Sequence, residues 1–228
     1  MYFIKYILSG MEEDTILYPR TLRDRVYIYL KNAILKGELK ANQRIQEKEI
    51  ASMFGVSTTP VREAILKLAG EGFIRIDSHK EAFVREISYK ELEDIYEVIR
   101  YLDSLCMRMV AETISDERIE EIERMTEKME EFCKIDTIDE YCELNSKIHI
   151  KIWEAVENKF LYKIILQVHD QFLRYNTQRA CVFKEPGALE ESLKDHKLLV
   201  EILKEKNKAK AEKFALRHWR ARFLPPPF

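Results

Sequence analysis

The chain has 228 residues, 34% of them charged, and its 38 Lys and Arg against 40 Asp and Glu give a formal net charge of −2. Its six Gly and six Pro are too few for a disordered or low-complexity protein, and the length suits two domains better than one. Four scattered cysteines without CxxC spacing argue against a disulfide-stapled secreted fold and indicate reduced thiols; they are Cys106, Cys133, Cys142 and Cys181.

The first 20 residues form an N-terminal extension that we expect to be flexible. Its opening ten, MYFIKYILSG, are apolar but too short to span a bilayer, and no small-residue cleavage site follows them. Met11 offers an alternative start. With no secretion signal or membrane segment, the sequence predicts a cytoplasmic protein without a membrane partner. A short proline-containing tail, residues 224–228, ends the chain.

Residues 21–87 are predicted to form a winged helix-turn-helix domain. A first helix, Leu22–Lys36, ends at a glycine. Two short amphipathic helices then lie within Ile45–Ala69, joined by Gly55, because glycine takes the left-handed conformation at a helix end at little cost. Two β-rich runs, 73–76 and 82–85, flank a polar turn after these helices, which is typical of a wing.

The second of the paired helices has the features of a DNA-recognition helix. Ser57 is suited to cap it, and Pro60 fits its first turn. Thr58, Thr59 and Arg62 face outward at its start. The N-terminal end of such a helix enters the major groove, where arginine donates two hydrogen bonds to guanine and threonine contacts a phosphate or a thymine methyl. An ordinary helical hairpin with a polar outer face is the alternative.

Residues 88–223 are predicted to form an antiparallel bundle of about six helices, because helical periodicity replaces strand signals there. The fold class is therefore mainly α, and the expected helices are 89–112, 115–134, 137–157, 160–179, 188–204 and 208–223. Residues 21–88 carry 12 Lys and Arg against 9 Asp and Glu, a net charge of +3, whereas residues 89–228 carry 24 against 28, a net charge of −4. A basic N-terminal domain followed by an acidic C-terminal domain suits a DNA contact that is confined to the N-terminal domain.

Three histidines of this bundle fall on apolar helix faces, namely His149, His196 and His218. An inward imidazole needs a partner, and three of them from three helices are able to meet at one divalent ion such as zinc, nickel or manganese. The alternative is that each is a core histidine with its own hydrogen bond. His169 is also partly inward, so the set of candidate ligands is not unique.

Residues Leu22–Val84 resemble the N-terminal domain of the GntR family of bacterial transcriptional regulators along their whole length and without gaps. The similar segments are AILKGELK, IQEKEIASMFGVS, TPVREAILKLAGEGFI and AFV. The resemblance implies that the domain contacts an operator through the following residues: Lys48, Ser57, Thr58, Thr59, Arg62 and, in the wing, His79. There are departures from the family pattern: Ala41-Asn42 replaces Pro-Gly, Thr58 replaces a frequent base-reading arginine, and Glu81 replaces a frequent wing glycine.

The second half resembles the all-helical FCD ligand-binding domain of the FadR subgroup of that family. The similar segments are IYEVIRYLDSLCMRMVAE, NSKIHIKIWEAVENKFL and DHKLLVEILKEKNKAKAEKFALRHW. The family's metal motif has an Asp four residues before a His and one His in each of the last two helices, and it maps onto Asn145, His149, His196 and His218. Asn145 offers a neutral carbonyl oxygen where the family has a carboxylate, which lowers the expected metal affinity.

By the same resemblance, the chain is a homodimeric, metabolite-responsive regulator, most simply a repressor, that binds an inverted-repeat operator. Small organic acids are the family's usual ligands, and Arg100 and Arg174 are candidates to pair with such a carboxylate. Two alternatives are the same regulator with a metal-free acyl ligand and a metal-dependent hydrolase. The hydrolase is disfavoured because no inward Glu stands as a general base beside the histidines.

Overall fold

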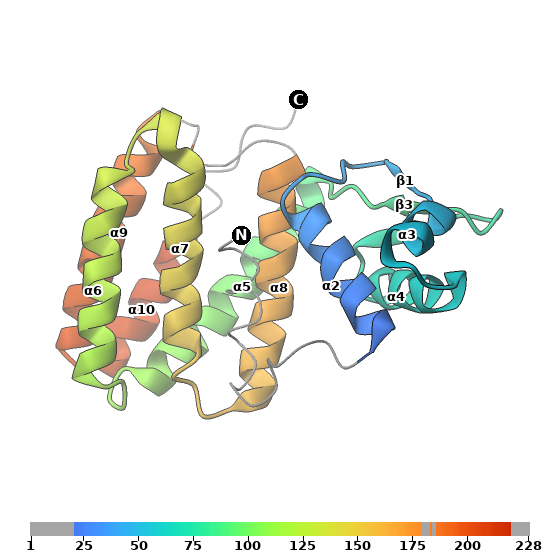
Figure 1. Cartoon of the computed structure of the whole chain (residues 1–228). Coiled ribbons are helices and arrows are strands. Elements are labelled where there is room, and N and C mark those ends of the chain that lie inside the picture. Colours follow the sequence, from blue (N-terminus) through green and yellow to red (C-terminus); the bar gives the residue numbers. More distant parts are fainter. Residues whose placement is uncertain (1–20, 179–182, 184–185, 220–228) are drawn as a thin grey trace. The chain divides into compact units, whose positions relative to one another are not determined.

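The computed structural model describes residues 21–178, 183 and 186–219, and its elements carry the labels of Figure 1. The described chain is mostly helical and divides into two compact units. The first unit holds the residues up to Ser88 together with the end of helix α8 from Leu173, and the second holds the remainder. The predicted extension and the predicted tail lie outside the described residues.

The first unit is a winged helix-turn-helix, as the sequence predicted. Helices α2 (Leu22–Leu35), α3 (Glu47–Phe54) and α4 (Thr58–Gly70) share one apolar core with a small antiparallel sheet of strand order β1-β3-β2. The strands are β1 (Arg44–Ile45), β2 (Ile74–Ile76) and β3 (Ala82–Val84). The β2–β3 hairpin matches the predicted wing. Strand β1 was missed, because two residues are too few to show the alternating pattern of a strand.

One turn of this unit depends on a left-handed residue that is not glycine. Asn42 has φ 63° in the turn that leads into β1, where the family has Pro-Gly. Asparagine adopts this conformation more readily than other side-chain-bearing residues, and its Nδ2 donates a hydrogen bond to Glu86 at 2.9 Å. The Ala-Asn pair therefore preserves the turn without glycine.

The second unit is a bundle of helices (Figure 1). They are α5 (Tyr89–Val110), α6 (Asp116–Glu131), α7 (Ile138–Trp153), α8 (Lys159–Gln178, which spans both units), α9 (Ala188–Lys204) and α10 (Lys208–His218), with a short 3-10 helix, η1 (Ile135–Thr137), before α7. Helix α6 packs against α7 and α9, and α5 packs against α7 and α10. The predicted helices agree with these to within a few residues, apart from η1 and the part of the last helix that lies outside the described residues.

Polar caps define where two of these helices begin. Ser115 precedes α6 and its hydroxyl accepts the backbone N–H of Arg118 at 3.3 Å, and Asn207 precedes α10 and accepts that of Lys210 at 3.0 Å. A fixed start sets which residues of a helix point inward. None of the helices in the described part of the chain is long and apolar enough to cross a membrane.

Candidate metal centre and recognition helix

Three histidines from three helices meet inside the second unit. His149 lies on α7, His196 on α9, and His218 is the last residue of α10. One ring nitrogen of each lies within 4.8 Å of the other two, and the Nε2 atoms of His149 and His218 are 3.2 Å apart. Two imidazole nitrogens bound at about 2.0–2.1 Å to one tetrahedral zinc ion lie about 3.3 Å apart. The spacing of this pair therefore suits a shared metal ion.

A backbone hydrogen bond orients the ring of His196. Its Nδ1 lies 2.8 Å from the carbonyl oxygen of Ser192, one turn earlier on α9, so Nδ1 donates and Nε2 keeps its lone pair. That Nε2 atom is buried and has no hydrogen-bond partner among the described residues. A buried polar atom without a partner is costly, so this nitrogen indicates a ligand site.

Burial favours the neutral form of His149 and His196. Desolvation first, and then the neighbouring imidazole of His218, lower the pKa of His149 well below its usual value and that of His196 to about 3. A neutral imidazole with an available lone pair is the form that binds a metal ion. His149 and His196 therefore need no deprotonation near neutral pH to bind one.

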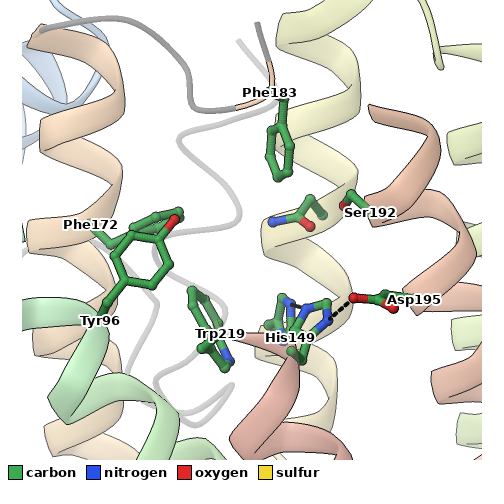
Figure 2. Close-up of a pocket in the computed structure, with 9 residues that line it drawn as sticks. Tyr96, His149, Phe172, Phe183, Ser192, Asp195 and Trp219 are labelled. Atoms are coloured by element: carbon green, nitrogen blue, oxygen red, sulfur yellow. Dashed lines mark hydrogen bonds and ion pairs between the residues drawn. The ribbon is translucent and has the colours of Figure 1, made fainter. Parts of the chain in front are cut away.

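A small cavity adjoins the cluster (Figure 2). Its volume is about 30 Å³, which accommodates an ion with one or two water molecules. Asn145 lies one turn before His149 on α7 and faces the same cavity, as the family motif requires of this position. The lining residues are Tyr96, Asn145, His149, Phe172, Phe183, Ser192, Asp195, His218 and Trp219.

One carboxylate, that of Asp195 on α9, also lines this cavity. Its Oδ2 lies 3.7 Å from Nδ1 of His218, whereas Nε2 of the same ring faces His149 (Figure 2). A metal-binding histidine commonly directs its other ring nitrogen at a carboxylate. Asp195 was not predicted from the sequence, because neighbouring residues on a helix point about 100° apart and His196 was taken to occupy the inward face alone.

A second carboxylate, that of the buried Asp103 on α5, holds two tryptophans beside His149. The Trp153 indole N–H donates to Oδ1 of Asp103 at 2.6 Å, and the Trp219 indole N–H donates to Oδ2 at 2.8 Å. Burial raises the pKa of Asp103, and these two hydrogen bonds oppose that rise. The His149 ring lies 5.6 Å from the Trp153 ring and 4.9 Å from the Trp219 ring, centroid to centroid.

Neither predicted arginine lies at this cavity. The Arg100 guanidinium lies over the exposed ring of Tyr101, 4.9 Å from its centroid. Arg174 is fully buried within the first unit, 5.0 Å from the ring centroid of Phe73, and it donates a hydrogen bond to the carbonyl oxygen of Gly72. The hypothesis that these arginines pair with a carboxylate beside the histidines therefore gains no support from this geometry.

The start of α4 is the second candidate site. Ser57, Thr59 and Arg62 are exposed, and Thr58 is half-buried. Ser57 occupies the N-cap position, but its side chain makes no capping hydrogen bond. Arg62 makes a two-point ion pair with Glu47 of α3, with Nη2 2.7 Å from Oε2 and Nε 3.2 Å from Oε1. This pair presents the guanidinium at the outer face of the helix-turn-helix.

Lys48 on α3 and His79 in the wing are exposed as well. In the wing turn, Oδ1 of Asp77 accepts the backbone N–H of His79 at 2.9 Å and that of Glu81 at 2.8 Å. Lys80 stands at the left-handed position of this turn, with φ 64°. A side chain in that conformation carries about 1–2 kcal/mol of strain, so the turn stays ordered through the Asp77 hydrogen bonds.

Known families match both halves of the chain. Residues 22–84 match the gntR family of bacterial regulatory proteins, and residues 94–221 match the FCD domain. The chain belongs to the GntR family and carries an FCD domain. It is a DNA-binding transcriptional regulator and not an enzyme, so the hydrolase considered from the sequence is set aside.

Individual members of the GntR family are similar over most of their length. The HTH-type transcriptional regulator YdhC of Bacillus subtilis is 28% identical over 194 residues, which cover 85% of each chain. The gluconate operon transcriptional repressor of Bacillus licheniformis is 25% identical over 206 residues, 86% of this chain and 84% of the repressor. The solved structure of Escherichia coli McbR/YncC covers 88% of this chain and 94% of its own, with a TM-score of 0.71 at 22% identity, and so shares the fold.

Proposed function

We propose that this regulator binds one divalent metal ion through His149, His196 and His218, with Asn145 in or next to the coordination shell. The observation that carries the proposal is the buried Nε2 of His196, which has no hydrogen-bond partner among the described residues, in a cluster where one ring nitrogen of each of the three histidines lies within 4.8 Å of the other two. Nitrogen and oxygen donors of this kind suit zinc, nickel or manganese. A bound ion would supply a positive charge and open coordination positions in a largely apolar interior.

A small organic acid is the ligand class that this arrangement suits best. A carboxylate at the open positions would lie beside Asn145 and Ser192, and its carbon skeleton would pack on the aromatic wall that includes Trp219. A metal-free acyl ligand fits less well, since several polar side chains face this cavity, among them Asn145, Ser192 and Asp195. The volume of about 30 Å³ favours a second candidate, in which the metal ion itself is the effector.

We propose that the regulator acts in the cytoplasm as a homodimer on an inverted-repeat operator, because two helix-turn-helix units are needed to contact two half-sites. Arg62 is the principal base reader in this proposal, and its exposed ion pair with Glu47 costs little to rearrange on DNA. The remaining contacts with phosphates and groove edges come from Lys48, Ser57, Thr58, Thr59 and His79.

Native mass spectrometry with metal analysis tests the metal and the dimer together. After incubation with zinc, nickel or manganese, we expect a dimer with one ion per chain. His196→Ala should lose stoichiometric metal, and His79→Ala, a matched change in the exposed wing, should keep it. A wild-type protein that stays metal-free after all three incubations would refute the proposed site.

Operator binding separates the two effector candidates. If the metal ion is the effector, zinc alone should change operator affinity, and chelation should reverse the change. If an acid is the effector, the metal-loaded protein should respond only when a carboxylate is added, and operator DNA should change the affinity for the acid by the same factor. A His149→Ala variant should respond to neither.

A further inference from the structure

The only two tryptophans of the chain share one acceptor. Trp153 at the end of α7 and Trp219 just after α10 each donate their indole N–H to Asp103, at 2.6 and 2.8 Å. Asp103 is 3% exposed, and each of its carboxylate oxygens accepts one of the two hydrogen bonds. Both oxygens of this carboxyl group are therefore committed to the two indoles.

The two indoles flank the ring of His149. The Trp153 and His149 rings are stacked, with 30° between their planes, and the Trp219 ring is inclined at 46° to the His149 ring. Trp219 also lines the cavity beside the histidines. A group that enters that cavity therefore lies beside an indole ring whose N–H is anchored on Asp103.

Asp103 belongs to α5, and α5 has a special place in the chain. Four residues separate it from β3, the last strand of the first unit, so it is the first element that follows the wing. Through the two indoles, one carboxylate of α5 is bonded to the end of α7 and to the end of α10. These are two of the three helices that supply the histidines.

We propose that Asp103 is a positioning residue of the histidine site and the point at which occupation of that site acts on helix α5; this inference rests on the proposed metal site. A close-packed interior transmits small displacements, and a buried indole N–H that lost its acceptor would be destabilising. When a ligand fixes the His149 ring, the two indoles that pack against it and the Asp103 carboxylate that accepts their hydrogen bonds must adjust their positions as one group. Helix α5 then moves or stiffens with them.

The Asp103→Asn variant tests this role, because an amide of the same shape has one acceptor oxygen and turns an N–H toward the other indole N–H. Asp94→Asn is the matched control, since it makes the same charge change on an exposed turn of α5 whose partner is Lys90. Nickel is the probe, because this paramagnetic ion quenches nearby indoles and both tryptophans flank His149. Hydrogen exchange of α5 and α9, with and without nickel, is the second readout.

In the wild type and in Asp94→Asn, nickel should quench the emission and slow the exchange of α5 amides. In Asp103→Asn, nickel affinity should fall by about 10–100-fold, as is usual when the support of a metal ligand is removed. At saturating nickel, α9 of this variant should still gain protection while α5 does not. Such a separation would not follow from a purely structural role, because a loosened core would change both helices alike.

The outcomes distinguish a failure of the role of Asp103 from a failure of the proposed metal site. If Asp103→Asn binds nickel normally and its α5 amides respond as in the wild type, the role of Asp103 is wrong and the metal site stands. If the wild type binds neither nickel nor zinc, the metal site fails and this role fails with it. If Asp103→Asn does not fold, Trp219→Phe replaces it, because that change keeps an aromatic ring and removes one of the two hydrogen bonds; an unchanged α5 response in this variant would overturn the inference.

Discussion

The charge around the histidine cluster can be altered without touching the three ring nitrogens. Asn145→Asp adds a carboxylate at the position where the family has one, and Asp195→Asn removes the carboxylate that lies 3.7 Å from His218. We expect the first change to tighten zinc binding and the second to weaken it. The double variant should bind zinc within about tenfold of the wild type, because the two changes leave the total charge of the lining unaltered.

The magnitude follows from the position of Asp195. Its Oδ2 faces Nδ1 of His218, whereas the ion would bind Nε2 on the other side of that ring. The distance from Oδ2 to a dication is then about 8 Å, and the attraction between them is at most about 4 kcal/mol for an effective dielectric constant of about 20. The Asp195 side chain is 13% exposed, so solvent screens part of this attraction. Supporting carboxylates are usually worth about 10–100-fold in metal affinity, or about 1.4–2.7 kcal/mol, and we expect each single change to fall in that range.

Competition against a chromophoric zinc chelator at fixed pH measures these affinities directly. Asp139→Asn serves as the control, since it removes a carboxylate from an exposed position of α7 and should leave zinc affinity unchanged. An Asp195→Asn variant that binds zinc as tightly as the wild type would refute the supporting role of Asp195. An Asn145→Asp variant that binds zinc more weakly would refute the assignment of residue 145 to the coordination shell.

Three further predictions concern the DNA contacts, the wing and the acid sensitivity of the bundle. Arg62→Ala should cost about 1–3 kcal/mol of operator binding and relax the sequence preference at one base pair per half-site, whereas Lys48→Ala should weaken binding to all sequences alike and flatten the salt dependence. Titrations of operator and scrambled duplexes at several salt concentrations distinguish the two variants. Equal losses of affinity for both duplexes in Arg62→Ala would contradict base reading. Lys80→Gly should raise the free energy of unfolding in urea by about 1 kcal/mol, because φ is 64° there, and no gain would mean that the wing turn is unstrained. Burial lowers the pKa of His169 to about 3, below its unfolded value of about 6.5, so protonation of the unfolded state should cost the wild type about 1.4 kcal/mol of stability per pH unit as the pH falls between these two values. His169→Phe should therefore lose less stability than the wild type between about pH 6 and 4 in the same urea assay. Parallel stability profiles for the two proteins would show that His169 is not the cause.

Local signals made most of the fold predictable from the sequence. The helix-turn-helix depends on a left-handed glycine, Gly55, and on the spacing of apolar residues along α3 and α4, all of which are visible in 25 residues of sequence. The three histidines were also predictable as a group, because each lies on the apolar face of its own helix. Strand β1 was not predictable, since it exists only through its pairing with β3.

Arg174 shows what a helical pattern leaves open. It lies five residues after His169 on α8 and was considered from the sequence as a partner for a carboxylate ligand. The environment changes along the helix, because α8 belongs to the second unit up to Phe172 and to the first unit from Leu173 onward. The guanidinium therefore packs on Phe73 instead of facing the histidines. Periodicity reports which face of a helix is buried but not what buries it.

Because Asn145 is neutral, the charge of the proposed metal site favours a ligand that carries one carboxylate. Among the described residues that line the cavity, Asp195 is the one carboxylate, and no Lys or Arg side chain takes part. A dication with neutral imidazoles and one carboxylate retains one positive charge, and a buried net charge is unfavourable unless it is neutralised. A ligand with a single carboxylate would neutralise it, whereas a residue-145 carboxylate would do so without any ligand. We therefore expect zinc and a monocarboxylate to bind this regulator cooperatively, so that adding acetate tightens zinc binding in the wild type and has less effect in Asn145→Asp.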